Sequence, residues 1–381
     1  MSLRDSSNKM HVLVFIDQMS RVGGSERVVS NLCRAWADAG ERVTLVTLSH
    51  DEAGIELPAS VARRHLTAAA KRSGWPGFFD SVLNGFRLGR LVRELKPDVA
   101  LAVSTVASLQ LAFARCASGT LRFGSEHGFA RHLGLPWHVR LARRLLYPRL
   151  DAVICPALAS ARALAEDCPG TRTAAVPNPL VMPLPGSGPG LPCVGLLRPG
   201  RRRFLTSARF EPLKRLDQLL EAFASVRNQL PDWDLVLLGD GPLRQDLAAR
   251  VRALGMEDRV IFPGMVGNPA EWYEACDLFV FSSHSEGFGM VLAEAMAHGL
   301  PCVSFDCDAG PADIIREGVD GFLVPTGDVA ALADRLRALA LDDARRSAFA
   351  CRAREAAERF GPSVVLARWR RLVEEASAAR A

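Results

Sequence analysis

The chain has 381 residues, which suits two domains better than one, and its 49% hydrophobic and 23% charged residues are typical of a globular protein with large cores. We expect no secretory signal and no membrane span, because no apolar stretch reaches the roughly 18 residues that a transmembrane helix needs. The 9 cysteines are scattered without a CxxC pair, which argues against zinc, redox and disulfide sites, and the net charge of +5 is concentrated in the first half.

Strands and helices alternate through the first half of the chain. We expect strands over 12–16, 43–48, 99–103 and 152–154, and helices over 25–39 and 86–95. These strands are almost continuously apolar, so helices must cover both faces of their sheet, which predicts a parallel, doubly wound arrangement. Residues 1–183 are therefore predicted to form an N-terminal Rossmann-like domain.

The second half repeats this alternation after a segment rich in proline, glycine and arginine. Residues 184–203 are predicted to be a linker, residues 204–360 a second doubly wound domain, and residues 361–381 a C-terminal amphipathic helix, with packing against the N-terminal domain as one option. The second set of strands is expected at 204–208, 234–238, 260–262, 278–281, 302–305 and 321–324. Two such domains place a ligand cleft between the carboxyl ends of their strands.

Two glutamates flank a predicted strand-to-helix turn in the second half. Glu286 begins the sequence Glu-Gly-Phe-Gly, and Glu294 lies in the helix that follows. The backbone N–H groups of Gly287, Phe288 and Gly289 at the start of that helix form an anion site. Two carboxylates beside an anion site indicate a ligand with both phosphate and hydroxyl groups, as in a nucleotide sugar. The alternative is that the carboxylates only compensate the helix dipole.

Six sequence blocks follow one another in the second half: SARFEPLKRLDQLL at 207–220, LGDGP at 238–242, VIFPG at 260–264, ACDLFVFS at 275–282, EGFG at 286–289 followed by Glu294, and DGFLV at 320–324. In this order they resemble the donor domain of the retaining family 4 glycosyltransferases (glycosyl transferases group 1), which have the GT-B fold. The first half resembles this family more loosely, through GGSE at 23–26 and VPNP at 176–179. The resemblance implies that the first domain binds the acceptor and the second binds a nucleotide-sugar donor.

The resemblance also assigns roles to residues of the second domain. It implies that Arg209 and Lys214 bind the donor diphosphate and stabilise the leaving nucleotide, a role suited to a planar guanidinium and a mobile ammonium. It implies that Glu294 binds the ribose hydroxyls and Glu286 the hydroxyls of the transferred sugar, with base contacts from the backbone around Val266. The alternative for the two cations is a solvated basic turn.

Four residues of the first domain complete the predicted site. Gly23 and Gly24 follow the first strand and would let the backbone approach the diphosphate closely, although such a turn can also be purely structural. By resemblance, His127 contacts the donor sugar and helps to organise the transition state; the alternatives are a structural histidine, or Glu126 as the residue that faces the acceptor. Asn178, between two prolines, is expected to line the cleft.

No metal or other cofactor is expected. Asp306-Cys-Asp308 spells the Asp-x-Asp pattern that binds a metal in GT-A transferases, but it follows a strand of the donor domain, where the resemblance implies that arginine, lysine and helix dipoles handle the diphosphate.

The basic excess of the first half allows two interpretations. Around 135–146, Leu135, Val139, Ala142 and Leu146 share one helical face, and three arginines (Arg140, Arg143 and Arg144) lie beside it. This pattern is typical of a core helix with a solvated basic side, and equally of a helix that docks on anionic lipid or captures a lipid-diphosphate acceptor. Nucleic acid is not an expected partner, because the chain lacks interleaved basic and aromatic residues.

Taken together, these features predict a retaining glycosyltransferase. It would move a hexose or N-acetylhexosamine from a nucleoside-diphosphate sugar, with UDP favoured, to a saccharide or lipid-linked saccharide acceptor in lipopolysaccharide or envelope polysaccharide biosynthesis. A cytoplasmic enzyme, peripheral at the inner face of the inner membrane, would fit this task. The alternatives are a non-catalytic nucleotide-sugar-binding protein and an epimerase of the same fold.

Overall fold

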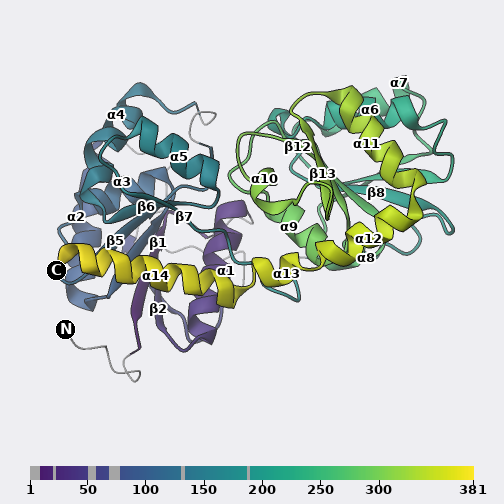
Figure 1. Cartoon of the computed structure of the whole chain (residues 1–381). Coiled ribbons are helices and arrows are strands. Elements are labelled where there is room, and N and C mark those ends of the chain that lie inside the picture. The colour runs from purple at the N-terminus through teal and green to yellow at the C-terminus, as the bar shows by residue number, and fades with distance from the viewer. Residues whose placement is uncertain (1–8, 20–22, 50–56, 68–77, 130–133, 187–188) are drawn as a thin grey trace. The chain divides into compact units, whose positions relative to one another are not determined.

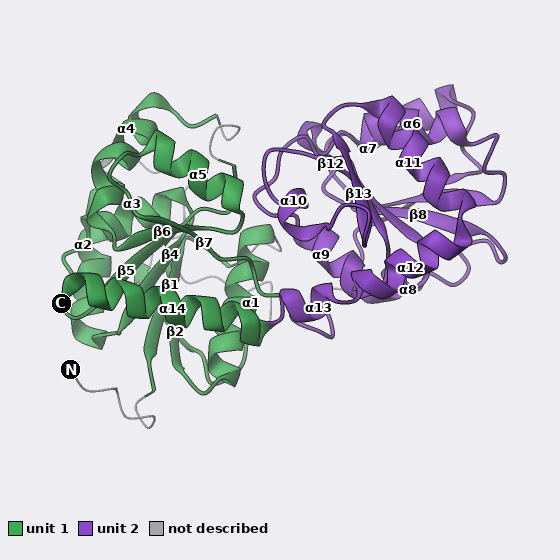
Figure 2. Cartoon of the chain, viewed as in Figure 1, with its two compact units in different colours: residues 1–179, 362–381 green, residues 180–361 purple. Residues whose placement is uncertain are grey.

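The computed structural model describes residues 9–19, 23–49, 57–67, 78–129, 134–186 and 189–381. The chain forms two compact units (Figure 2): unit 1 contains residues 1–179 and 362–381, and unit 2 contains residues 180–361. Each unit is built around its own parallel sheet. The predicted α/β fold of two doubly wound sheets is confirmed.

Unit 1 contains a sheet of 7 described strands in the order β3-β2-β1-β4-β5-β6-β7, all paired in parallel. Its strands are β1 (His11–Ile16), β2 (Arg42–Ser49), β3 (Ala62–Thr67), β4 (Val99–Val103), β5 (Leu121–Ser125), β6 (Ala152–Cys155) and β7 (Thr173–Ala175). Its helices are α1 (Gly24–Asp38), α2 (Phe78–Leu95), α3 (Thr105–Phe113), α4 (Trp137–Leu146), the short η2 (Tyr147–Arg149), α5 (Leu158–Asp167) and α14 (Pro362–Arg380).

The C-terminal helix α14 belongs to unit 1 (Figure 1). The ring of its Trp369 lies edge-on to Trp36 of α1, with centroids 5.6 Å apart, and to Phe123 of β5, at 6.1 Å. At its last turn, Arg380 forms an ion pair with Asp151, with a shortest N–O distance of 2.5 Å. Aromatic packing in the middle and an ion pair at the end thus fix this helix against the sheet of unit 1.

Unit 2 contains a sheet of 6 described strands in the order β10-β9-β8-β11-β12-β13, also parallel. Its strands are β8 (Arg202–Ser207), β9 (Trp233–Leu238), β10 (Val260–Gly264), β11 (Leu278–Phe281), β12 (Cys302–Asp306) and β13 (Gly321–Pro325). Its helices are η3 (Pro212–Lys214), α6 (Leu216–Val226), α7 (Arg244–Ala253), α8 (Pro269–Glu274), α9 (Met290–Ala297), α10 (Pro311–Ile314), α11 (Val329–Leu341), α12 (Asp343–Ala353) and α13 (Ala356–Arg359).

Both faces of the unit 2 sheet are buried, as its apolar strands predict. Successive residues point into different clusters: Phe204 joins the core under α6, α7 and α11, and Leu205 joins the core under α8 and α9. In the first core, the ring of Phe204 stacks on Trp233 at 4.4 Å. This alternation explains why the sequence shows continuous apolar runs and not a polar–apolar pattern.

The segment that the sequence marks as a linker, 184–203, lies in unit 2, and so does the expected domain boundary at 183. The backbone of Leu191 accepts a hydrogen bond from Trp272 Nε1 (3.0 Å), and Cys193 N–H donates to Glu271 (2.8 Å). Part of its basic run has a structural task, because Arg198 and Arg201 both pair with the fully buried carboxylate of Asp234. The segment is therefore held against α8 and β9, and its last two residues begin β8.

Three of the strands were not predicted from the sequence, each for a physical reason. β3 is an edge strand whose side chains are mostly exposed, so it has no apolar run. β7 is only 3 residues long. β5 contains an arginine and a glycine, which break its apolar pattern. No helix in the described ranges is long and apolar enough to cross a bilayer.

The strand order places a switch point in each unit. In unit 1 the chain turns from β1 toward β2 on one side and later returns to pair β4 with β1 on the other. In unit 2, β8 has β9 on one side and β11 on the other. Ligands of open α/β sheets bind at the carboxyl ends of the strands at such points, where successive loops diverge. The loops that follow β8 and β11, and those that follow β1 and β4, are therefore the first places to look for a site.

Candidate functional site

The loops after β8 and β11 are joined by hydrogen bonds at the switch point of unit 2. The N–H of His284 donates to the carbonyl of Leu213 (2.8 Å), and the hydroxyl of Ser282 donates to the carbonyl of Lys214 (2.8 Å). Arg215, the next residue, has left-handed backbone geometry with φ of 46° and turns the chain into α6. These contacts present the side chain of Lys214 to the loop that contains Glu286.

Lys214 and Glu286 form an ion pair with an Nζ–Oε1 distance of 2.5 Å. Their side chains keep 23% and 14% exposure, so the pair is half-buried and still open to solvent on one side. An ammonium held in this way can exchange its carboxylate partner for a phosphate oxygen, because both are anionic acceptors of comparable geometry. Two residues far apart in sequence thus meet at the carboxyl edge of the unit 2 sheet.

Arg209 lies in the same loop as Lys214 but is much freer. Its side chain is 71% exposed and forms an ion pair with Glu211 at 2.7 Å. A surface pair of this kind has little net energy and breaks easily. The structure therefore leaves Arg209 able to move toward an anion near Lys214, without placing it there.

The Glu-Gly-Phe-Gly turn has the strained geometry that its glycines allow. Gly289 caps α9 with φ of 95°, and the buried ring of Phe288 lies edge-on to Phe360 at 5.5 Å. Among the described residues, the N–H groups of Gly287, Phe288 and Gly289 donate no backbone hydrogen bond. A neighbouring loop braces the turn: a Cβ on Gly310 would lie 2.0 Å from the carbonyl oxygen of Phe288. Open N–H groups at a fixed helix start are what an anion needs.

Glu294 is in a different state from Glu286. It is 1% exposed, and the hydroxyl of Tyr273 donates to its Oε2 at 3.2 Å. The ring of Tyr273 stacks on His298 (5.2 Å), whose Nδ1 is 2.8 Å from the backbone oxygen of Glu294. Glu294 is therefore a buried side chain of α9 whose carboxylate is held by Tyr273.

The loops after β9 and β10 complete this edge of unit 2. Gly239 has φ of 121°, and a Cβ there would lie 1.9 Å from the carbonyl oxygen of Ala208, so only glycine allows the β9 loop to approach β8. Its N–H donates to the carbonyl of Gly264 (2.9 Å). Val266, just beyond, is half-buried against the core that also contains Tyr273. The predicted base-contacting backbone thus belongs to the same edge.

In unit 1, Gly23 and Gly24 begin α1 after β1. Gly23 is the N-cap residue, and a Cβ built on it would lie 2.5 Å from a carboxylate oxygen of Glu26, which folds back over the helix start. Among the described residues, Gly24 has no heavy atom within 4 Å of its hypothetical Cβ. The only close atoms at Gly23 belong to the flexible Glu26 side chain, which can move, so within the described residues neither glycine is required by local packing.

His127 lies two residues beyond the end of β5. Its Nε2 lies 2.9 Å from the hydroxyl of Ser125, and its Nδ1 is buried with no hydrogen-bond partner among the described residues. Burial lowers the pKa of His127 to about 4, so the ring is neutral near pH 7. A neutral imidazole with one nitrogen bonded and the other unsatisfied is able to make one further hydrogen bond.

Glu126, the alternative to His127, is not free to face an acceptor. It is 3% exposed and receives hydrogen bonds from Arg143 at both oxygens (3.0 and 2.9 Å), from the hydroxyl of Tyr147, and from Thr105 (3.2 Å). Arg143 is itself 2% exposed, so its expected place on a solvated basic face is wrong. Burial, and after it the neighbouring Glu126 carboxylate, raises the pKa of Tyr147, so its phenol stays a proton donor.

Two further residues of unit 1 lie near these loops. Asn178 is 6% exposed, and the neighbouring carbonyl of Pro179 accepts a hydrogen bond from Asn31 of α1 (3.0 Å). Ser104, which follows β4 at the switch point, has φ of 115°, which is uncommon for a residue other than glycine. Its hydroxyl caps α3 by accepting from Ala107 N–H (3.1 Å). No pattern in the sequence predicts this backbone strain at Ser104.

The Asp306-Cys-Asp308 run ends β12 with both aspartates exposed and Cys307 buried between them. Within the described ranges, no three or more histidine, cysteine, aspartate or glutamate side chains gather as a metal site would require.

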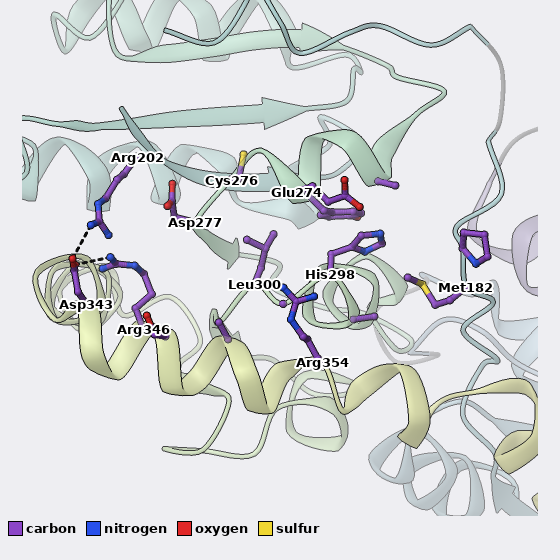
Figure 3. Close-up of a pocket in the computed structure, with 17 residues that line it drawn as sticks. Met182, Arg202, Glu274, Cys276, Asp277, His298, Leu300, Asp343, Arg346 and Arg354 are labelled. Atoms are coloured by element: carbon purple, nitrogen blue, oxygen red, sulfur yellow. Dashed lines mark hydrogen bonds and ion pairs between the residues drawn. The ribbon is translucent and has the colours of Figure 1, made fainter. Parts of the chain in front are cut away.

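A cavity of about 900 Å³ lies at the opposite edge of the unit 2 sheet (Figure 3). Its lining includes Arg202, Asp277 and Leu300, which stand at the amino ends of β8, β11 and β12. Arg202 and Arg346 both form ion pairs with Asp343 there, and this aspartate neutralises part of the positive charge of the two arginines. Since ligands of this fold class bind at the carboxyl ends, the cavity is separate from the candidate site.

Comparisons with known proteins show which family the chain belongs to. Residues 194–356 match the family Glycosyl transferases group 1, and residues 22–181 match Glycosyltransferase Family 4. The structure of HepE from Anabaena, solved with UDP and glucose, superposes with a TM-score of 0.74 at 20% identity, covering 96% of this chain and 100% of that chain. The chain belongs to the GT-B glycosyltransferases.

The relatives of this GT-B glycosyltransferase include proteins of polysaccharide synthesis. An exopolysaccharide phosphotransferase of Streptomyces coelicolor is 31% identical over 305 residues, which is 79% of this chain but only 31% of that protein. The chain thus spans about a third of the length of this relative. An amylovoran biosynthesis glycosyltransferase of Erwinia amylovora is 24% identical over 94% of this chain and 98% of its own length.

The GT-B glycosyltransferase thus has its predicted residues on two edges, one in each unit. In unit 2, Lys214 meets Glu286, while Arg209 and Glu294 belong to neighbouring segments. The sequence analysis did not predict that Glu126, Arg143 and Tyr147 form one buried cluster. A signal for it existed, because Val139, Arg143 and Leu146 recur at the spacing of one helical face.

Proposed function

We propose that this chain transfers a hexosyl or N-acetylhexosaminyl group from a nucleoside-diphosphate sugar, with UDP favoured, to a saccharide or lipid-linked saccharide acceptor, with retention of the anomeric configuration. The observation that carries the proposal is the half-buried ion pair of Lys214 and Glu286 at the switch point of unit 2. In this pair, Lys214 is the cation that would bind the diphosphate, and Glu286 is the carboxylate that would bind the sugar hydroxyls.

The donor diphosphate would bind between this pair and the start of α9. Its oxygens accept hydrogen bonds from Lys214 and from the open N–H groups at 287–289, where the helix dipole adds to the attraction. Arg209, with its exposed side chain, swings in as a second cation. Glu286, released from part of its contact with Lys214, then accepts hydrogen bonds from the hydroxyls of the sugar.

The nucleoside would extend toward the loop after β10. Its base meets the backbone around Val266, and the ribose hydroxyls reach Glu294, with Tyr273 holding that carboxylate in place (3.2 Å). A carboxylate suits two vicinal hydroxyls because it can accept from both. UDP bound to HepE supports a nucleotide of this kind in the fold.

In the transfer step, the bond between the anomeric carbon and the β-phosphate oxygen breaks, and its electron pair stays with the diphosphate. The acceptor oxygen forms the new bond on the same face, and its proton passes to the departing diphosphate. Lys214 and Arg209 stabilise the charge that develops there. No metal is needed in this scheme, because these two cations and the α9 N-terminus supply the positive charge.

Residues of unit 1 would contribute contacts to the donor sugar and to the acceptor. If Ser125 donates to Nε2 of His127, then Nδ1 carries the proton and donates to a sugar oxygen. Gly24, with open space around it, allows the backbone to approach the ligand, and Asn178 lines the same region. The polysaccharide-synthesis names of two relatives support a role in envelope polysaccharide or lipopolysaccharide assembly, and we propose that this takes place at the cytoplasmic face of the inner membrane.

The test is a panel of nucleoside-diphosphate sugars incubated with the whole chain, with and without extracted glycan acceptors. Release of the nucleoside diphosphate is measured together with the mass and anomeric configuration of the product. We expect one donor to give slow hydrolysis alone and faster, α-retained transfer with acceptor. Tight binding without turnover, or conversion of the donor to an epimer, would overturn the proposal.

A further inference from the structure

The helix α4 presents an apolar stripe to solvent in addition to its core face. Trp137 is 71% exposed, Leu141 48% and Leu145 64%. These residues are spaced four apart, so they form one line along the helix. The face that the sequence analysis singled out is the buried one, with Val139 and Leu146 each 6% exposed. The helix is thus apolar on two sides, and only one of them packs against the part of the protein that the structure describes.

Arginines flank this stripe. Arg140 and Arg144 are exposed and lie on one side of it, and His138 lies on the other. Neither arginine forms an ion pair within the described part of the chain. A cavity of about 560 Å³ beside α4 is lined by these arginines but also by Glu166 and Asp167 of α5, so its interior has mixed charge. Arg140 and Arg144 thus share this cavity with two carboxylates of α5, and both arginines are also exposed to solvent next to the apolar stripe.

A second helix repeats the pattern on the same layer. Both α2 and α4 pack against α3, which lies between them (Figure 2). On α2, Leu83 is 47% exposed and Phe86 54%, and exposed Arg87 and Arg90 lie beside them. Two helices of one layer thus combine outward apolar side chains with arginines.

The inner side of α4 is anchored in unit 1. There, Arg143 donates two hydrogen bonds to Glu126, and its guanidinium lies 5.5 Å from the centre of the Tyr147 ring. This buried contact fixes the backbone of the helix, and with it the direction that the outer face presents to solvent. A surface that is preorganised in this way loses little conformational entropy when it binds.

We propose that the outer faces of α4 and α2 form a docking surface for an anionic lipid bilayer. Trp137, Leu141 and Leu145 enter the boundary between headgroups and acyl chains, and Arg140 and Arg144 contact anionic headgroups. The combination of one apolar line with adjacent arginines fits a charged, amphipathic surface, whereas a second copy of this chain would offer the same positive charge and be repelled. The proposal does not depend on the transferase activity, since it is argued from unit 1 surfaces alone.

The test uses the full chain with vesicles of phosphatidylcholine, with and without an equal share of phosphatidylglycerol. Sedimentation should show binding only to the anionic vesicles, weakened by added salt. L141S/L145S and R140E/R144E should each lower the partition coefficient by about tenfold or more, because one removes apolar burial and the other the charge attraction. Quenching of tryptophan fluorescence by brominated acyl chains should occur in the wild type and diminish strongly in W137F.

Matched controls separate this surface from general charge and apolarity. L341S removes a leucine of unit 2 with 61% exposure, and R368E/R371E reverses two exposed arginines of α14. Both should bind anionic vesicles like the wild type, and all variants should keep their thermal unfolding temperature. Absence of binding to anionic vesicles, equal losses in the controls, or self-association that depends on Leu145 would each overturn the proposal. Loss of donor turnover with intact vesicle binding would instead contradict only the proposed function.

Discussion

The two units hold their central ion pairs in opposite ways. In unit 1, Glu126 and Arg143 are almost fully buried, and Tyr147 and Thr105 fill the remaining acceptor capacity of the carboxylate. In unit 2, Lys214 and Glu286 make one short contact and keep 23% and 14% exposure. The first pair has no capacity left for a ligand, while the second can exchange a partner without leaving a charge buried.

This difference separates structural from ligand-binding charge. Breaking a buried pair leaves an uncompensated charge in a low-dielectric interior, so the cost appears in folding. Breaking a half-exposed pair lets water or a ligand replace the lost partner, so the cost appears in binding and rate. The predictions below test whether the two pairs behave in this way.

The largest effect is expected on the stability of unit 1. Arg143→Ala should lower the free energy of unfolding by about 3–5 kcal/mol, because Glu126 would remain buried without its cation. Denaturant unfolding followed by circular dichroism measures this. Arg140→Ala, on the exposed side of the same helix, is the control and should change stability by less than about 0.5 kcal/mol. Equal, small effects of both variants on the free energy of unfolding would show that the buried cluster does not stabilise unit 1.

The opposite behaviour is expected for Lys214. Lys214→Ala should lower donor turnover by about 10²- to 10³-fold, because it removes charge stabilisation from the departing diphosphate, and should barely change stability. Arg337→Ala removes a half-buried arginine of α11 that pairs with Asp334, far from this loop in sequence, and should turn over like the wild type. Near-normal turnover by the Lys214 variant would remove that residue from the proposed mechanism.

The histidine of unit 1 should appear in the pH dependence of stability. Burial lowers the pKa of His127 from 6.5 to about 4, so between these values the unfolded chain binds a proton that the folded chain does not. Stability should therefore fall as the pH drops through this window, by up to about 3 kcal/mol from this residue. His127→Asn should flatten the curve there. Parallel curves for the two proteins would mean that His127 is protonated normally in the folded state.

A smaller effect on turnover is expected at Gly24, where a substitution would change only how closely a ligand can approach the backbone. Gly24→Ala should leave stability unchanged or slightly raised, since its Cβ would meet no atom within 4 Å, but should lower turnover by about tenfold if a ligand approaches this backbone. Gly119→Ala, which also has open space around its Cβ, is the control. If turnover is the same in both variants, Gly24 is not part of the site.

No effect is expected from chelation. Turnover measured with EDTA should equal turnover without it, because arginine, lysine and the helix start supply the positive charge in the proposed mechanism. Lost activity that Mn²⁺ restores would point instead to Asp306 and Asp308.

The sequence predicted those elements that depend on local pattern. Continuous apolar runs located most central strands, and the Glu-Gly-Phe-Gly turn was predicted where Gly289 does cap a helix. It could not predict β3, whose exposed side chains have no pattern, or the buried state of Glu294 beneath Tyr273. The pairing of Glu126 with Arg143 joins segments whose approach is set by the fold, and local spacing alone does not specify it.

The most direct test of the account is to locate the donor by hydrogen exchange. The whole chain is incubated with the nucleotide sugar that the panel identifies, and protection of backbone amides is compared with the free protein. We predict protection at 208–216 and 283–292, around Lys214 and Glu286, at the carboxyl ends of β8 and β11. Protection confined to the residues that line the cavity of Figure 3, at 270–277, 297–300 and 343–354, would contradict the account.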